Sequence, residues 1–175
     1  MMFSELVKRA HATALEKGWH EGEDRSLNRA GALIALMHSE VVEATHATSH
    51  RTIEELSDPV ACLAEELADV LIRLADAVGW FGWAVRDVDL SLPRSNMSGL
   101  DCGDSVHYAL ATFGTEVIRI NGKPSQLIAA EVYGACVAWL APSAEGNDCA
   151  VLLDAIKAKL AKNKTRSFRH GGKLL

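Results

Sequence analysis

The sequence has few of the features that mark disordered, membrane-spanning or exported chains. It holds only 4 prolines in 175 residues, and its 49% hydrophobic content is typical of a globular protein, which argues against disorder. The longest apolar run, LIAAEVYGACVAWLA, is interrupted by Glu131 and is shorter than the roughly 20 residues of a membrane span. The N-terminal segment MMFSELVKRA brings in charge at the fifth residue and lacks the apolar core of a signal peptide. We therefore expect a soluble, cytoplasmic protein of one domain.

Paired cysteines and an excess of positive charge are also missing. The four cysteines are widely spaced and form no C-x-x-C motif, so neither a zinc clip nor a redox pair is indicated, and we expect reduced thiols in packing roles. A net charge of -5 gives no counterion-release advantage on a phosphate backbone, which disfavours binding to nucleic acid polymers. A small phosphorylated ligand bridged by a metal ion is compatible with this charge.

Apolar residues recur at helical spacing in six segments, and alternation with period two is nowhere sustained. The pattern predicts an all-α protein, a bundle of about six helices. The expected helices cover residues 4–18, 28–50, 58–85, 104–120, 125–141 and 148–164. Asp58 followed by Pro59 marks the start of the third helix. The turn-rich segment SLPRSNMSGLDCGDS divides the chain into two halves of similar helical content.

The two halves resemble each other in the order of their acidic residues. HSEVVEA and EELADVLIRLA in the first half occupy the same order as GTEVIRI and AAEVYGACVAWLA in the second. The alignment places Glu40 on Glu116, Glu43 on Arg119, Glu66 on Glu131 and Asp69 on Gly134. It predicts an internal pseudo-dimer made of a catalytic half (1–90), a degenerate second half (104–163) and a basic tail (164–175). Two unrelated helical hairpins that share a glutamate are the alternative.

Two pairs of carboxylates stand one helical turn apart. Glu40-x-x-Glu43 and Glu66-x-x-Asp69 lie in consecutive apolar helices, so four carboxylates meet if these helices pack face to face. Such a cluster cannot stay ionised alone. A hard divalent cation resolves the repulsion, because Mg²⁺ takes carboxylate oxygens and recruits substrate phosphates. Mg²⁺ is therefore the expected cofactor, with Mn²⁺ as a possible substitute.

Other residues near these motifs carry weaker signals. Asp76, seven residues after Asp69, is an outer-shell ligand or a solvated position, and Arg73 is expected to pair with Asp69. Acids at this spacing also occur on solvated helix faces. A ferritin-like di-iron bundle is the other metal chemistry of helical carboxylates, but it needs two Glu-x-x-His motifs, and the chain has only the one from Glu43 to His46.

The C-terminal segment KLAKNKTRSFRHGGKLL is basic in an otherwise acidic chain. Its lysines and arginines flank a Gly171-Gly172 turn. Such a tail can fold over bound phosphates, because arginine makes bidentate contacts and lysine offers a point charge. A solvated helix end, whose cations are favoured by the helix dipole, is the alternative.

Trp19 lies outside the periodic segments, in the stretch EKGWHEG. A tryptophan at such a position stacks on a base or closes the end of a bundle. The other tryptophans stand in apolar helices, where we expect core or interface positions.

Four segments resemble, in order, the elements of MazG-like nucleotide pyrophosphohydrolases, within the all-α NTP pyrophosphatase superfamily that includes dimeric dUTPases. They are ALEKGWH, ALIALMHSEVVEA, EELADVLIRLADAVG and AKLAKNKTRSFRHGGK, and they cover about residues 5–85 and 150–173. The family motif is Glu-Glu-x-x-Glu followed by Glu-x-x-Asp. This chain departs from it where Ser39 replaces the first Glu, and it carries a segment, residues 90–150, that short members lack.

The resemblance implies one all-α domain over residues 1–175 and hydrolysis of a nucleoside triphosphate between its α and β phosphates. The products are NMP or dNMP and pyrophosphate. It implies that four residues bind Mg²⁺: Glu40, Glu43, Glu66 and Asp69. Glu43 and Glu40 are the catalytic candidates, with Glu43 the better placed to accept a proton from the attacking water.

The resemblance also implies where the substrate binds. The phosphate-binding candidates are Lys159, Asn163, Arg166 and Lys173, and the nucleotide-pocket candidates are Trp19 and His38. We expect a homodimer, unless the internal pseudo-dimer supplies a dimer-like interface within one chain. The competing function is a catalytically weakened nucleotide- or metal-binding regulatory module, which Ser39 and the degenerate second half favour.

Overall fold

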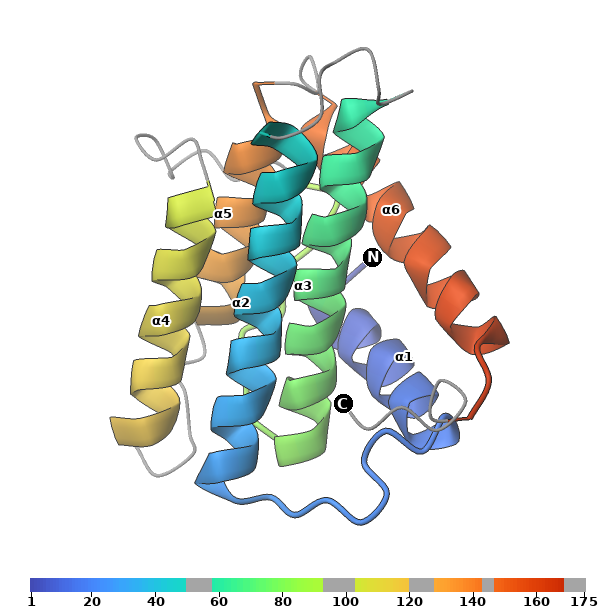
Figure 1. The fold of residues 1–175 in the computed structure, drawn as a ribbon, viewed down its shortest axis with the longest axis vertical. Coiled ribbons are helices and arrows are strands. Elements are labelled where there is room, and N and C mark those ends of the chain that lie inside the picture. Colours follow the sequence, from blue (N-terminus) through green and yellow to red (C-terminus); the bar gives the residue numbers. More distant parts are fainter. Residues whose placement is uncertain (50–57, 93–102, 120–127, 143–146, 169–175) are drawn as a thin grey trace.

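The computed structural model describes residues 1–49, 58–92, 103–119, 128–142 and 147–168, and these residues form six α-helices (Figure 1). The helices are α1 (Phe3–Glu16), α2 (Leu27–Ser49), α3 (Pro59–Phe81), α4 (Gly103–Arg119), α5 (Ile128–Leu140) and α6 (Asp148–Thr165). No strand occurs in these ranges beyond an isolated bridge between Met2 and Asp89. The prediction of an all-α bundle of about six helices is confirmed.

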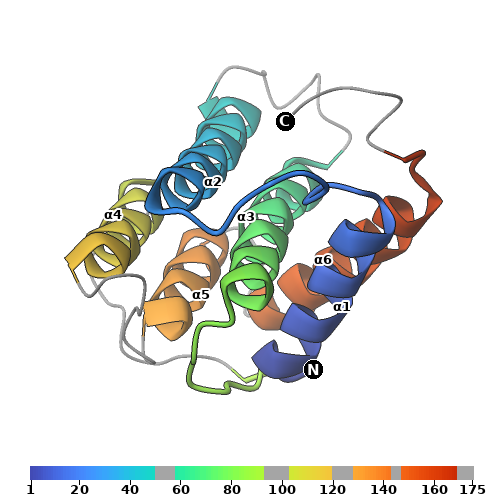
Figure 2. The ribbon, with the colours of Figure 1, turned by 90° about the horizontal axis from the view of Figure 1, so that it is seen from below.

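The central element of the bundle is α3, which packs against α1, α2, α5 and α6 (Figure 2). On one side α2, α4 and α5 form, together with α3, a four-helix bundle. On the other side α1 and α6 lie next to each other along α3. A helix in this position must be apolar around most of its circumference, and twelve of the 23 residues of α3 are buried.

Both ends of α3 are set by local sequence. The side chain of Asp58 accepts a hydrogen bond from the backbone N–H of Ala61 at 3.0 Å, and Pro59 occupies the first turn, as the sequence predicts. The C-terminal end comes at Phe81 and not at residue 85. Gly82 there takes the left-handed conformation (φ 65°) and donates its N–H to the carbonyls of Val78 and Gly79, which stops the helix.

The predicted repeat corresponds to two neighbouring helical hairpins. The α2–α3 pair lies beside the α4–α5 pair, with α2 against α4 and α3 against α5 (Figure 1). Glu116 is on α4 and the exposed Glu131 is on α5. This arrangement is compatible with a pseudo-dimer, and common ancestry of the two halves stays a prediction.

Among the described residues, no helix combines the length and apolar character needed to cross a membrane.

Candidate metal and phosphate site

The packing of α2 against α3 brings the predicted acidic residues together. Glu40 and Glu43 face α3 from successive turns of α2. One carboxylate oxygen from each of Glu40, Glu43 and Glu66 lies within 4.8 Å of the other two. Asp69, one turn after Glu66, lines the same cavity as Glu40 and Glu43. The four acids that the sequence singled out therefore form one acidic cluster.

The acidic cluster borders a cavity of about 240 Å³ between α2, α3 and α6, which we call the acidic cavity. Its lining residues are Trp19, Glu40, Glu43, Asp69, Ile72, Arg73, Asn163 and Arg166. Carboxylates come from α2 and α3, whereas Asn163 and Arg166 come from the end of α6. The acidic side can bind cations, and the α6 side offers an amide and a guanidinium to an anion.

Two cations of the chain already neutralise part of the acidic cluster. The Arg73 guanidinium reaches Oε1 of Glu40 from Nε at 2.7 Å and from Nη2 at 2.6 Å. The expected pairing of Arg73 with Asp69 is therefore wrong: the guanidinium crosses to α2, and Lys159 takes its place. The ammonium of Lys159 donates to Oδ2 of Asp69 at 2.7 Å and lies 3.5 Å from Glu65.

The protonation behaviour of the acidic cluster reflects its burial and its crowding. Burial raises the pKa of Glu40, the charges of Asp69 and Glu43 add to this, and Arg73 offsets only part of it. Burial also raises the pKa of Glu66, against the lowering effect of Lys159 and with three neighbouring carboxylates adding to it. Burial would lower the pKa of Lys159, but its hydrogen bond to Asp69 and the surrounding negative charge raise it. The cluster thus holds more negative charge than its own cations compensate.

The donor set of the acidic cluster fits a hard divalent cation. Its metal-binding atoms are all carboxylate oxygens, which Mg²⁺ prefers, and the cavity leaves room for the waters that Mg²⁺ keeps. Within the described ranges, the group of three acids that lies close enough to share an ion contains no histidine. The ligand set therefore suits magnesium better than a di-iron centre.

The three phosphate-binding candidates in the described ranges come from the last helix or from the residue that follows it, but they differ in their surroundings. Asn163 is 4% exposed, lines the acidic cavity, and its Oδ1 has no hydrogen-bond partner among the described residues. Arg166 directly follows α6 and lines the cavity with a partly exposed side chain. Lys159 is buried against Asp69. Lys173 lies outside the described residues.

The structure separates the two nucleotide-pocket candidates. Trp19 lies in the turn after α1 and lines the acidic cavity. His38 lies on α2 facing α4, where its Nδ1 is 2.7 Å from Nδ1 of His107 and the two rings stack at 5.0 Å. Burial, and then the charge of His107, lower the pKa of His38. His38 is not among the residues that line the acidic cavity.

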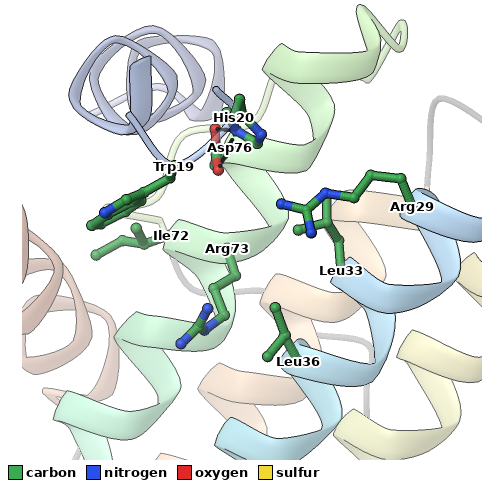
Figure 3. A pocket seen from close by; sticks show the side chains of 8 residues that line it. All are labelled: Trp19, His20, Arg29, Leu33, Leu36, Ile72, Arg73 and Asp76. Carbon is green, nitrogen blue, oxygen red and sulfur yellow. Dashed lines mark hydrogen bonds and ion pairs between the residues drawn. The ribbon is translucent and has the colours of Figure 1, made fainter. Parts of the chain in front are cut away.

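Sequence reasoning missed a smaller cavity of about 30 Å³ next to the acidic one. Its lining residues are Trp19, His20, Arg29, Leu33, Leu36, Ile72, Arg73 and Asp76 (Figure 3). Trp19, Ile72 and Arg73 line both cavities. The helical spacing of Glu66, Asp69, Arg73 and Asp76 signals that one face of α3 serves both. Asp76 lines the smaller cavity, away from the outer-shell position proposed for it.

No family model, curated protein or solved structure matched this chain in comparisons with known proteins.

Proposed function

We propose that the protein is a magnesium-dependent nucleoside triphosphate pyrophosphohydrolase, which cleaves between the α and β phosphates to give NMP or dNMP and pyrophosphate. The observation that carries the proposal is the meeting of four carboxylates from α2 and α3 at one cavity that also contains Asn163 and Arg166. A site with carboxylates on one side and phosphate-binding groups on the other suits a metal-bridged polyphosphate. The type of reaction is inferred from the resemblance of the sequence to MazG-like enzymes.

In this proposal four residues hold the metal: Glu40, Glu43, Glu66 and Asp69. When bound, Mg²⁺ neutralises the triphosphate, stabilises the leaving pyrophosphate and lowers the pKa of an attacking water.

Glu43 is the residue best placed to accept a proton from the attacking water. It is exposed at the acidic cavity, and among the described residues no lysine or arginine lies within ion-pair distance of it. Glu40, in contrast, is buried and bound by Arg73. A free carboxylate can change its hydrogen-bond partner during the reaction at lower cost than a paired one.

Arg73 and Lys159 are placed to exchange partners when a metal-bound substrate enters. Each lies against one predicted metal ligand, Arg73 on Glu40 and Lys159 on Asp69. If a bound cation took over as counter-charge of these carboxylates, Arg73 and Lys159 would be released to bind the phosphates. Arg166, which needs no such release, would bind phosphate oxygens in bidentate fashion.

The second candidate function is a nucleotide- or metal-binding module with weakened catalysis. Two observations favour it: Arg73 and Lys159 neutralise two of the four metal ligands, and Ser39 stands where the family has a glutamate. The Ser39 hydroxyl is exposed and donates to the carbonyl of Leu36 at 2.7 Å, so it takes up no ligand role.

We further propose a cytoplasmic homodimer. Tyr108 and Ile118, which are 72% and 67% exposed on α4, would be the candidates for apolar contacts between the two copies.

The deciding experiment is a screen of ribo- and deoxyribonucleoside triphosphates with Mg²⁺, in which pyrophosphate and orthophosphate are measured separately. We expect pyrophosphate and the monophosphate in equal amounts, and the screen would also name the preferred base. If nucleotide raises the melting temperature but no triphosphate is cleaved, the binding module is the better description.

A further inference from the structure

A second group of metal-ligating side chains lies outside the acidic cavity. His11 comes from α1, His20 from the turn that follows it, and Asp76 from α3. Nδ1 of His11 is 3.0 Å from Oδ1 of Asp76, and Nε2 of His20 is 2.9 Å from each oxygen of the same carboxylate. One ligand atom from each residue lies within 4.8 Å of the other two. Three separate parts of the chain therefore direct nitrogen and oxygen donors at one point.

The surrounding residues hold these donors in place. His20 is 5% exposed, and its ring stacks on Trp80 at 4.2 Å with an interplanar angle of 5°. The Arg25 guanidinium lies 4.9 Å from the centre of the Trp80 ring. A Cβ atom added at Gly79 would come within 2.6 Å of Cβ of His11, so this glycine permits the close approach of α1 to α3. Such fixed side chains bind an ion with little loss of entropy.

Charge balance favours a cation at this point. Asp76 is buried, and within the described ranges its ion partners are the two histidines, with no lysine or arginine at ion-pair distance. The two imidazoles lie at hydrogen-bond distance of the carboxylate, but no permanently charged cation of the described residues balances its charge. A divalent ion would compensate that charge and take the lone pairs of both imidazoles.

There is also space for a further ligand. The 30 Å³ cavity is bordered by His20 and Asp76 and has room for about two water molecules (Figure 3). Nδ1 of His20, a residue that lines this cavity, is buried and has no hydrogen-bond partner among the described residues. Arg29 reaches into the cavity from α2, but its Nε lies 3.4 Å from Glu23, which offsets its charge.

We propose that His11, His20 and Asp76 bind a divalent transition-metal ion of the zinc class, with water as a further ligand, and that this ion ties α1 and the turn after it to α3. Imidazole suits zinc and its neighbours, whereas Mg²⁺ prefers the all-oxygen acidic cluster. The chain would thus sort two kinds of ion between two sites by donor chemistry. This proposal does not rest on the proposed hydrolase activity.

The test uses the full chain, stripped of metal with a chelator and titrated with Zn²⁺ by calorimetry. We expect one ion per chain, an X-ray absorption spectrum at the zinc edge that contains two imidazoles, and a rise in melting temperature. His11 is partly exposed, so we expect the fold to tolerate His11→Gln. This variant should lower the affinity for Zn²⁺ at least tenfold and remove most of the rise in melting temperature.

Two control variants separate this site from the other candidates for zinc. Glu66→Gln changes the acidic cluster, and His107→Gln changes the His38–His107 pair; both should keep the imidazole-rich zinc site. The proposal is overturned if the parent protein binds no zinc, if its bound zinc shows no imidazole, or if binding is lost in His107→Gln and kept in a folded His11→Gln variant.

Discussion

Glu66 is the most informative single residue of the acidic cluster. It contributes an oxygen to the group of three acids and, unlike Glu40 and Asp69, it makes no ion pair among the described residues. Burial raises its pKa, which means that the ionised form is destabilised and that a bound cation would stabilise it. Neutralising it should harm metal binding much more than it harms the fold.

The prediction for this residue concerns the variant Glu66→Gln. We expect it to lower kcat for triphosphate hydrolysis by at least about a hundredfold, because a lost metal ligand weakens transition-state charge stabilisation. Helical content, measured by circular dichroism, should not change. Glu131→Gln is the matched control, since Glu131 is exposed on α5 and the predicted repeat aligns it with Glu66. Parental turnover in Glu66→Gln would refute the assignment of the site.

At the scale of the helices, the close contact between α1 and α3 depends on a glycine in α3. Gly79 lies in the last turn of α3, where His11 of α1 occupies the space that a Cβ would take. Gly31 of α2 is also helical, but it is exposed, and nothing lies within 4 Å of the position of its Cβ. The same substitution should therefore have opposite effects at these two glycines.

We predict that Gly79→Ala lowers the free energy of unfolding by about 1 to 3 kcal/mol, because the helices must separate or repack. Gly31→Ala should raise it by about 0.5 to 1 kcal/mol, because alanine loses less backbone entropy in a helix. Urea unfolding of both variants beside the parent measures the two changes. Equal effects would mean that α1 and α3 do not pack as closely as described.

At the scale of the whole molecule, the acidic cluster links stability to pH and to metal. The pKa values of Glu40 and Glu66 are raised above their ordinary value of 4.5. The folded state therefore binds more protons than the unfolded state between pH 4.5 and the raised values, so these two groups make stability fall as pH increases through that window. Lys159, whose pKa is also raised, contributes stability that is fully present below pH 10.5 and is lost only as pH rises above it.

The corresponding prediction compares melting temperatures with and without Mg²⁺. Without Mg²⁺, the parent should lose stability relative to Glu66→Gln as pH rises from 4.5. At neutral pH, Mg²⁺ at a hundred times its Kd should stabilise the parent by about 2.7 kcal/mol, or about 5 to 10 °C. The shift should be smaller near pH 4.5 and small in Glu66→Gln. A shift of the same size in parent and variant would place the metal elsewhere.

Much of the fold could be predicted from the sequence because its signals are local. Helical periodicity gave six segments that correspond to the six helices, and Asp58 with Pro59 marked the start of α3. The end of α3 was placed too late, because the apolar pattern continues past Gly82, whose left-handed conformation stops the helix. The spacing of the acids on α2 and α3 was enough to expect a shared cluster once two apolar helices pack together.

The sequence by itself determined which residues share a helix face, because side chains three or four apart in an α-helix are neighbours whatever surrounds them. Only the tertiary structure decided which faces meet. It paired Arg73 with Glu40 and not with Asp69, and it turned His38 toward His107 and away from the acidic cavity. It also joined His11 and His20 to Asp76, across at least 56 residues. Such contacts depend on how whole helices pack, which no short stretch of sequence encodes.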